Sequence, residues 1–325
     1  MLDAVAMAGS NLLSPMVLFF VLGFLAAMAR SDLSIPEPIA KAISLYLMLA
    51  IGFKGGASLA SHGVDATMIG VAAAGIAMSF LLPMLAFILA RGLARLSPID
   101  AAAVAAHYGS ISIVTFVSAS EFLRMLGVSF EGYMVAVMAL METPAIISGL
   151  WLARRYLQRP DSGRGQVLHE VFLNGSVVLL TGAFIIGAVS GTKGMTTVAP
   201  FIDAPFKGVL CFFLLDMGLI AANRLRGTRA ISPGLAAFGI LMPLIGGAIG
   251  VLIGSVMGLS PGGTALFGVL SASASYIAVP AAMRLALPEA NPAVYLTVSL
   301  AITFPFNLTV GIPLYLAAAR WITGA

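Results

Sequence analysis

The sequence has few charged residues and only one cysteine, and both shortages exclude whole classes of protein. Charged residues make up 9% of the 325 positions, whereas soluble domains carry about 25% because their surfaces contact water. The single cysteine, Cys211, excludes an internal disulfide and any metal site built from cysteines. Water is therefore not the main solvent of this chain, and disulfide bonds do not hold its core together.

Nucleotide-binding and metal-binding motifs are also lacking. The sequence contains no Gly-rich phosphate loop, no ATP-binding motif and no histidine cluster with metal-ligand spacing. We therefore do not expect this chain to hydrolyse ATP as an energy source, and an ion gradient is the energy source that remains. The isoelectric point of about 9.4 does not indicate a nucleic-acid partner, because basic membrane proteins usually follow the positive-inside rule.

Long hydrophobic runs are what the sequence has instead of charge. Hydrophobic residues make up 60% of the chain, the mean hydropathy is +1.05, and a membrane-spanning helix needs about 20 apolar residues. Ten apolar runs lie near residues 12–29, 38–53, 66–90, 100–120, 129–153, 170–190, 203–221, 232–257, 262–283 and 292–318. The pattern predicts an all-α integral membrane protein with ten transmembrane helices in the lipid bilayer.

The basic residues are distributed unevenly between the connections. Of the 17 Lys and Arg residues, five fall on one side of the predicted membrane, and the remaining twelve fall on the other side. The smaller set is Lys54, Arg124, Lys193, Lys207 and Arg320. Because basic residues are in excess on the cytoplasmic side, we expect both termini outside the cytoplasm of a multi-pass protein in the bacterial inner membrane.

An internal repeat relates the two halves of the chain. Leu96-Ser97-Pro98 recurs as Leu259-Ser260-Pro261, and the same offset places Ser110-Ile111-Ser112 on Ser273-Ala274-Ser275. With five spans in each unit, the two copies enter the membrane from opposite sides, which gives the inverted repeat found in many secondary transporters. We predict a first repeat at 1–153, a cytoplasmic linker at 154–169 and a second, inverted repeat at 170–325.

Clusters of small hydroxyl residues lie in the fourth and ninth spans. The fourth contains Gly109 to Thr115, and the ninth contains Ser271 to Tyr276, followed by Pro280. Ser and Thr compete for backbone hydrogen bonds and Pro fits the first turn of a helix, so we expect both spans to break near the middle of the membrane. The N–H groups that begin the second half-helices favour an anion, and the free carbonyls of the first halves favour sodium. The alternative is that small residues only allow close helix packing.

Glu142 is a carboxylate in the middle of the fifth span, two residues before Pro144. A charge at that depth costs roughly 2.5–3.5 kcal/mol on insertion scales, so the side chain needs a partner or a cavity. It is either a sodium ligand that binds a proton when sodium is absent, or an acid that supports the kink at Pro144. Two further residues allow two interpretations. Asn307 is a ligand or a helix–helix contact, and His107 is a proton shuttle or, more often for a lone histidine, a hydrogen-bonded packing residue.

At these segments the chain resembles the sodium-dependent bicarbonate transporters first known from cyanobacteria and their bacterial relatives. The best-matching stretch runs from Ser271 to Leu314 and includes the turn Pro288-Glu289-Ala290-Asn291-Pro292-Ala293-Val294-Tyr295. The Gly- and Ser-rich break at Gly109 to Thr115 is similar as well. Glu142, with Pro144, stands where the family has an Asp followed two places later by Pro.

The resemblance implies a five-plus-five inverted repeat in which the broken fourth and ninth helices cross, with bicarbonate at the crossing and sodium beside it. Together with the serine clusters, it assigns substrate binding to Gly109, Ser110, Ser112, Thr115, Ser273, Ser275 and Tyr276. The assigned sodium ligands are Glu142, Ser112, Ser271, Ser273 and Ser275. No cofactor is expected besides sodium as the coupling ion, and no catalytic residue is assigned.

Three residues depart from the family pattern. Tyr276 stands where the family has an acid, and Ile113 and Val114 stand where it has small residues, so ion coupling or the choice of anion differs if these positions contribute. The family often assembles as a homotrimer. Its cyanobacterial members bind a PII-like regulatory protein through a long central loop, and the shorter loop here argues against that partner.

Other functions stay open on the sequence alone. The apolar residues Ile113, Val114, Phe116 and Tyr276 near the break favour a sodium-coupled carrier of an organic anion, similar to bile-acid symporters. A passive channel would conduct without a sodium gradient, and a membrane sensor would carry or dock a soluble output domain. An intramembrane enzyme using His107 and a serine would need a third orienting group, which the sequence does not identify.

Overall fold

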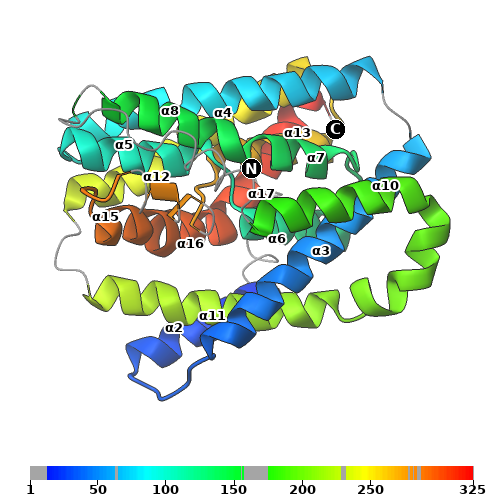
Figure 1. The fold of residues 1–325 in the computed structure, drawn as a ribbon, viewed down its shortest axis with the longest axis horizontal. Helices are drawn as coiled ribbons and strands as arrows, with labels where there is room; N and C mark the ends of the chain where they lie inside the picture. The colour runs from blue at the N-terminus through cyan, green and yellow to red at the C-terminus, as the bar shows by residue number, and fades with distance from the viewer. Residues whose placement is uncertain are drawn as a thin grey trace.

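The computed structural model describes residues 13–62, 65–154, 156, 175–227, 232–276, 279–280, 282–283 and 287–324, and these residues form helices and turns without strands (Figure 1). The first half contains α2 (Pro15–Met28), α3 (Glu37–His62), α4 (Ala66–Gly92), α5 (Pro98–Gly109), α6 (Ile113–Met125), α7 (Met134–Leu140) and α8 (Glu142–Arg154). The second half contains α10 (Gly175–Ile202), α11 (Phe206–Gly227), α12 (Pro233–Val256), α13 (Pro261–Ala272), α15 (Pro292–Leu296), α16 (Phe304–Phe306) and α17 (Ile312–Thr323), with π-helical segments at Thr297–Thr303 and Asn307–Gly311.

The lengths of these helices confirm the helical membrane class. Eight helical segments among the described residues are long and apolar enough to cross a membrane. Each of the ten predicted runs overlaps a helix, but α2 has 14 residues and α13 has 12, fewer than the roughly 20 that a full span needs. The ten-span count therefore stays a prediction, and the predicted linker at 154–169, apart from Arg154 and Tyr156, lies outside the described residues.

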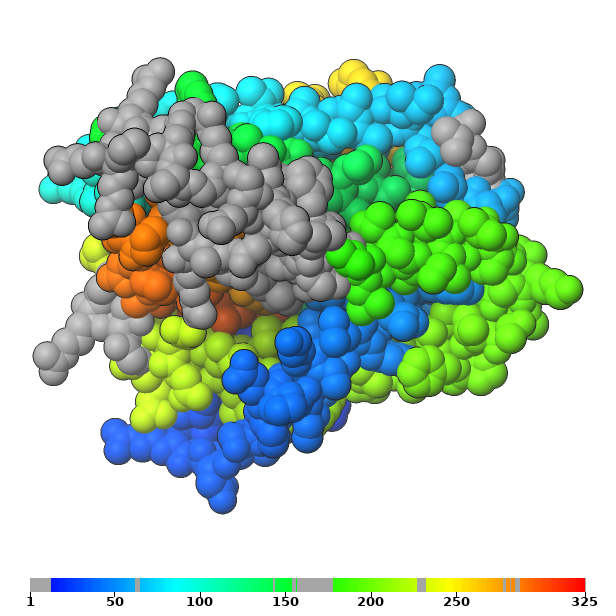
Figure 2. All heavy atoms as spheres, in the orientation of Figure 1, coloured from blue at the N-terminus to red at the C-terminus, as the bar shows by residue number. Residues whose placement is uncertain are grey.

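Four helices form one part of the molecule, the α2–α3–α10–α11 group. α2 packs along α11 and α3 along α10, and these helices occupy the lower and right-hand parts of the view in Figures 1 and 2. A Cβ on Gly23 would collide with the Leu215 carbonyl oxygen, and one on Gly218 with the Phe20 carbonyl oxygen. Direct backbone contact through small residues is typical of packing between membrane helices. α10 bends at Gly191, where φ is 55°.

The second group surrounds α5, α6 and α13. α4 packs on α5 and α5 on α8, while α12 packs on α13 and α13 on α17. The most apolar window of the Pro98–Met125 span is 100% buried inside the protein, whereas that of Ala66–Gly92 is 39% buried. Protein, and not lipid, therefore surrounds the α5–α6 span, so its interruption does not expose backbone polar groups to hydrocarbon.

Candidate functional site

α5 and α13 begin and end in the same way. Ser97 caps α5 and Ser260 caps α13, each accepting a hydrogen bond at 3.1 Å from the N–H three residues later, and each helix then starts with proline. Both helices have 12 residues and are followed by a serine with extended backbone, Ser110 (φ −87°, ψ 160°) and Ser273 (φ −84°, ψ 161°). The segments that the sequence match aligned therefore share one local structure.

The chain between α5 and α6 contacts the chain that follows α13. The Ser112 N–H donates to Ser273 Oγ at 3.0 Å, and the Ser275 N–H donates to the His107 carbonyl oxygen at 2.8 Å. The two interruptions are thus hydrogen-bonded to each other in both directions. This contact brings the predicted site residues Ser112, Ser273 and Ser275 together inside the protein, where all three are buried.

α6 starts at this contact. The Ser112 hydroxyl accepts hydrogen bonds from the Thr115 N–H at 3.2 Å and from the Thr115 hydroxyl at 2.9 Å. The N-terminus of a helix carries about half a positive charge on its free N–H groups. The start of this 13-residue helix therefore supplies N–H donors and positive potential next to Ser273.

Several buried polar atoms near the contact have no hydrogen-bond partner among the described residues. Ser110 Oγ and Ser271 Oγ are two of them. The Tyr276 hydroxyl lies close to Ser112, but the two groups are not aligned for a hydrogen bond. Because buried polar groups usually have partners, the hydroxyls of Ser110 and Tyr276 are available to contact a small polar ligand. The Ser271 side chain instead packs against Gly250 of α12.

His107 lies beside the same contact. Its ring stacks on Tyr295 with centroids 4.6 Å apart, and its Nδ1 lies 2.7 Å from the Ala103 carbonyl oxygen. A carbonyl only accepts hydrogen bonds, so Nδ1 donates, while Nε2 is buried without a partner among the described residues. These contacts account for the ring as a packing residue at the end of α5.

Gly109 and Glu142 occupy different surroundings from the serines. A Cβ on Gly109 would collide with the Pro83 ring, so the glycine lets α4 approach the end of α5. Glu142 begins α8, is 2% exposed, and its Oε2 has no described partner. Within the described part of the chain, no hydrogen bond or ion pair joins Glu142 to the serine clusters.

Residues of the last span support the contact, and the sequence pattern identified only one of them. Asn307 Nδ2 donates to the carbonyl oxygen of Ala272, the last residue of α13, at 2.9 Å, and Asn307 Oδ1 accepts from the Tyr315 hydroxyl at 3.0 Å. The Tyr108 hydroxyl lies 2.5 Å from Thr303 Oγ1. Asn307 therefore makes a helix–helix contact. In the sequence, Thr303 only marks a kink of the tenth span together with Pro305 and Asn307, and its contact with Tyr108 has no local signal because single hydroxyl residues are common in membrane spans.

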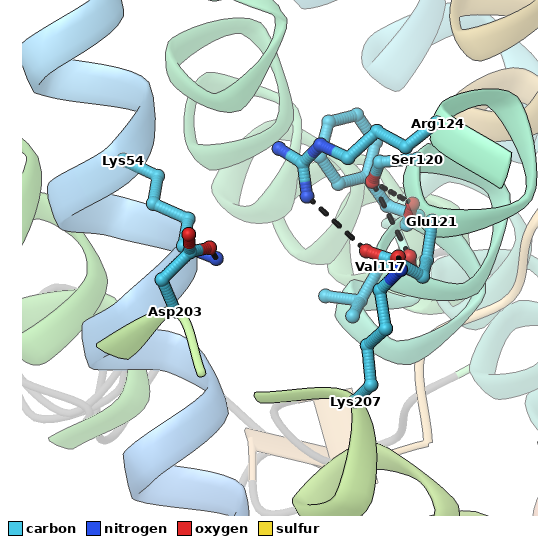
Figure 3. Close-up of polar contacts among 8 residues, drawn as sticks. Lys54, Val117, Ser120, Glu121, Arg124, Asp203 and Lys207 are labelled. Carbon is cyan, nitrogen blue, oxygen red and sulfur yellow. Dashed lines mark hydrogen bonds and ion pairs between the residues drawn. The ribbon is translucent and has the colours of Figure 1, made fainter. Parts of the chain in front are cut away.

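A second polar cluster lies at the far end of α6 (Figure 3). Lys54 Nζ contacts Asp203 Oδ1 at 2.6 Å, and Lys207 Nζ lies 2.8 Å from Oε1 of the buried Glu121. Arg124 Nη1 is 3.5 Å from the other Glu121 oxygen. The Lys54 ammonium lowers the pKa of the Asp203 carboxyl, which lies in the turn between α10 and α11. Glu121 has no distinct signal in the sequence, because it follows directly on the predicted span 100–120, where charged residues are common.

The donor groups at the contact of the two interruptions restrict which metal ions can bind there. No group of three or more His, Cys, Asp or Glu residues in the described ranges could bind a metal ion. Hydroxyl and carbonyl oxygens are present at the contact of the two interruptions, and such oxygens suit a hard cation such as sodium. A transition-metal site is not supported there.

The fold and the site define a multi-pass helical membrane protein whose buried polar centre is formed where two interrupted helices meet. Residues 15–320 match the Na⁺-dependent bicarbonate transporter superfamily, and the chain belongs to that family. This confirms the family inferred from the sequence. The family is one of transporters and not of enzymes, so it gives no support to the enzyme alternative based on His107. No curated protein is significantly similar to the chain.

Proposed function

We propose that this protein couples the entry of sodium to the uptake of a small anion, bicarbonate in the first place, by alternating access. The observation that carries the proposal is the pair of hydrogen bonds between the interruptions, Ser112 to Ser273 and Ser275 to His107. The family supplies the expected substrate and ion. The structure supplies a buried set of hydroxyls around the start of a helix.

The proposed anion site uses dipoles in place of charged side chains. An anion at the start of α6 faces its N–H groups and their partial positive charge. Ser110 and Thr115 stand on one side of the contact, and Ser275 and Tyr276 on the other, with Gly109 keeping α4 close. Hydroxyl donors there replace the water that the anion loses on entering the protein.

The proposed sodium site lies beside the anion. Ser112, Ser271, Ser273 and Ser275 contribute hydroxyl or carbonyl oxygens, and Glu142 contributes a carboxylate after a shift of α8 or through an intervening water. Sodium then reduces the cost of burying the anion, since opposite charges attract strongly where water is excluded. This mutual stabilisation is the physical basis for coupling the two movements.

The packing of the two halves supports the inverted repeat with ten spans. α2 pairs with α11 and α3 with α10, so the first and second spans of one repeat pair with the second and first of the other. α4, α5 and α8 pack together as α12, α13 and α17 do. We infer that the α2–α3–α10–α11 group moves against the second group, as repeats do in such carriers. The proposal also includes assembly as a homotrimer and an orientation with both termini outside the cytoplasm.

The test is uptake of labelled bicarbonate into proteoliposomes, with an inward sodium gradient and with potassium in place of sodium. We expect accumulation only with sodium, loss of accumulation in Ser275→Ala, and a weaker apparent sodium affinity in Glu142→Gln. Ser190→Ala is the matched control, because Ser190 is a partly exposed serine of α10, outside both serine clusters, whose hydroxyl donates to the Ile186 carbonyl oxygen. Equal uptake with sodium and potassium would reject the proposal.

A second candidate is a sodium-coupled carrier of an organic anion. Ile113 and Val114 are buried at the start of α6, and Tyr276 packs edge-on against Phe304 with ring centroids 5.4 Å apart. These apolar walls suit a carboxylate with a hydrocarbon part. Absence of bicarbonate uptake, together with sodium-dependent thermal stabilisation and binding of an organic carboxylate, would favour this candidate.

A further inference from the structure

A cavity of about 600 Å³ lies between α6 and the α2–α3–α10–α11 group. Its charged wall is formed by Lys54, Glu121, Arg124, Asp203 and Lys207, and its hydroxyl groups come from Ser58, Ser61 and Thr192. Arg124 follows Ser112 by twelve residues along α6, which places it about 18 Å from the interruption at a helical rise of about 1.5 Å per residue. The cavity is therefore separate from the proposed substrate site.

The charges in this wall do not balance. Lys54 and Asp203 neutralise each other through their contact at 2.6 Å. Glu121 faces both Lys207 and Arg124, at 2.8 Å and 3.5 Å. Two cations on one carboxylate leave one positive charge without a counterion in the described wall. The lowered pKa of Asp203 is consistent with this, because Arg124 and Lys207 add to the effect of Lys54.

The Arg124 guanidinium is positioned to bind an anion through this unbalanced positive charge. Its guanidinium points away from α6 toward the side where Lys54 and Asp203 lie (Figure 3), and it packs 5.5 Å from the centroid of the Phe130 ring. The 3.5 Å separation from Glu121 is long for a charge-assisted hydrogen bond, which is usually about 2.7–2.9 Å. A guanidinium has five N–H donors in a planar fork that matches two oxygens of one anion.

We propose that this cavity binds one small monovalent anion with two or more oxygens, such as bicarbonate or a carboxylate, through Arg124 and Lys207. The side chains of these two residues are 37% and 65% exposed, so an anion reaches them from water. On the proposed orientation the cavity opens to the outside. It then serves as an entry station for the transported anion, a role that rests on the proposed function, whereas anion binding in the cavity does not.

The experiment measures the electrical potential and the occupancy of the cavity without using transport. Cys211 is replaced by alanine and Ala204, an exposed residue of the cavity wall, by cysteine. The rates of modification by anionic and cationic thiol reagents of equal size are then compared in purified protein without sodium. We expect the anionic reagent to react faster and bicarbonate to slow both reactions.

Variants assign the effect to the two cations. Arg124→Gln lowers the anionic-to-cationic rate ratio several-fold, because it removes one positive charge from the wall of the same cavity, and it removes the protection by bicarbonate. Arg124→Lys keeps the ratio, which separates charge from misfolding. Lys193→Gln removes an exposed charge outside the wall and changes neither. A ratio near one in the parent protein, or protection that persists in Arg124→Gln, would overturn the proposal.

The two proposals fail independently. If bicarbonate slows the modification of Ala204→Cys in a protein that does not accumulate bicarbonate, the anion site in the cavity is supported and bicarbonate is rejected as the transported substrate. Sodium-driven uptake without any protection at Ala204→Cys would reject the cavity site alone. Ser275→Ala lies in the proposed substrate site, so it abolishes uptake and leaves the protection of the cavity unchanged.

Discussion

At the scale of single residues, the serines near the interruptions differ in what their hydroxyls do. Ser273 Oγ accepts from the Ser112 N–H and donates to the Leu270 carbonyl oxygen at 3.0 Å. Ser110 Oγ has no hydrogen-bond partner among the described residues. Ser273 is therefore engaged in holding the two interruptions together, whereas Ser110 keeps its hydrogen-bonding capacity for another molecule.

Ser273→Ala and Ser110→Ala separate these two roles. We expect Ser273→Ala to destabilise the protein by about 1–3 kcal/mol, because it leaves a buried N–H without its acceptor. Ser110→Ala removes an unpartnered hydroxyl, so its stability changes by less than about 0.5 kcal/mol while the KM for the anion rises. Thermal unfolding in detergent and proteoliposome uptake measure the two effects. Equal loss of stability in both variants would contradict the distinction.

At the scale of helices, backbone contact joins α2 to α11. Gly218 faces the Phe20 carbonyl oxygen so closely that a Cβ would collide with it. Gly208, in the same helix, has nothing within 4 Å of the position of an added Cβ. The two glycines therefore share an element and differ only in what surrounds them.

Gly218→Ala and Gly208→Ala test this packing. Gly218→Ala forces α2 and α11 apart, and we expect it to destabilise the protein by about 1–3 kcal/mol, the usual cost of overpacking. Gly208→Ala meets no neighbour and slightly favours the helix, so its unfolding temperature stays the same or rises. Unfolding curves of the two variants in one detergent provide the measurement. A lower unfolding temperature for Gly208→Ala than for Gly218→Ala would show that α2 and α11 are not in contact.

At the scale of the whole molecule, Glu121 and Lys207 connect the two groups of helices. Glu121 belongs to α6, which packs on α13 in the second group, and Lys207 belongs to α11 in the α2–α3–α10–α11 group. Lys54 and Asp203, by contrast, both lie in the α2–α3–α10–α11 group. If the groups move against each other during transport, the first pair must separate and the second need not.

Cross-linking distinguishes the two pairs. In a Cys211→Ala background, Glu121→Cys with Lys207→Cys is joined by a short bifunctional thiol reagent with a cleavable centre. Because the variant lacks the Lys207 ammonium, uptake is compared in the same protein before cross-linking, after cross-linking and after cleavage. We expect the uptake that this variant retains to stop on cross-linking and to return when the link is cleaved, because the two groups are locked together. Lys54→Cys with Asp203→Cys, treated in the same way, retains uptake. Undiminished transport by the first cross-linked pair would exclude a relative movement of the groups at this contact.

Much of this architecture was predictable because the bilayer imposes strict requirements. Hydrocarbon forces each span to satisfy its own backbone hydrogen bonds, so apolar runs read directly as helices, and every predicted run overlaps one. Local chemistry was predictable too: Ser97-Pro98 and Ser260-Pro261 each begin a helix as the sequence indicates. The interruption after Gly109 follows from the residues themselves, since hydroxyl side chains compete for the backbone.

The sequence by itself determined the membrane environment, the helical class, the family and the position of the interruption in the fourth span. Only the tertiary structure decided which distant groups meet: the Ser112 N–H with Ser273, Asn307 with the end of α13, and Glu121 with Lys207. The physical reason is that helix formation depends on neighbours three or four positions away. Contact between spans depends instead on the packing of whole helices, to which no single local pattern corresponds.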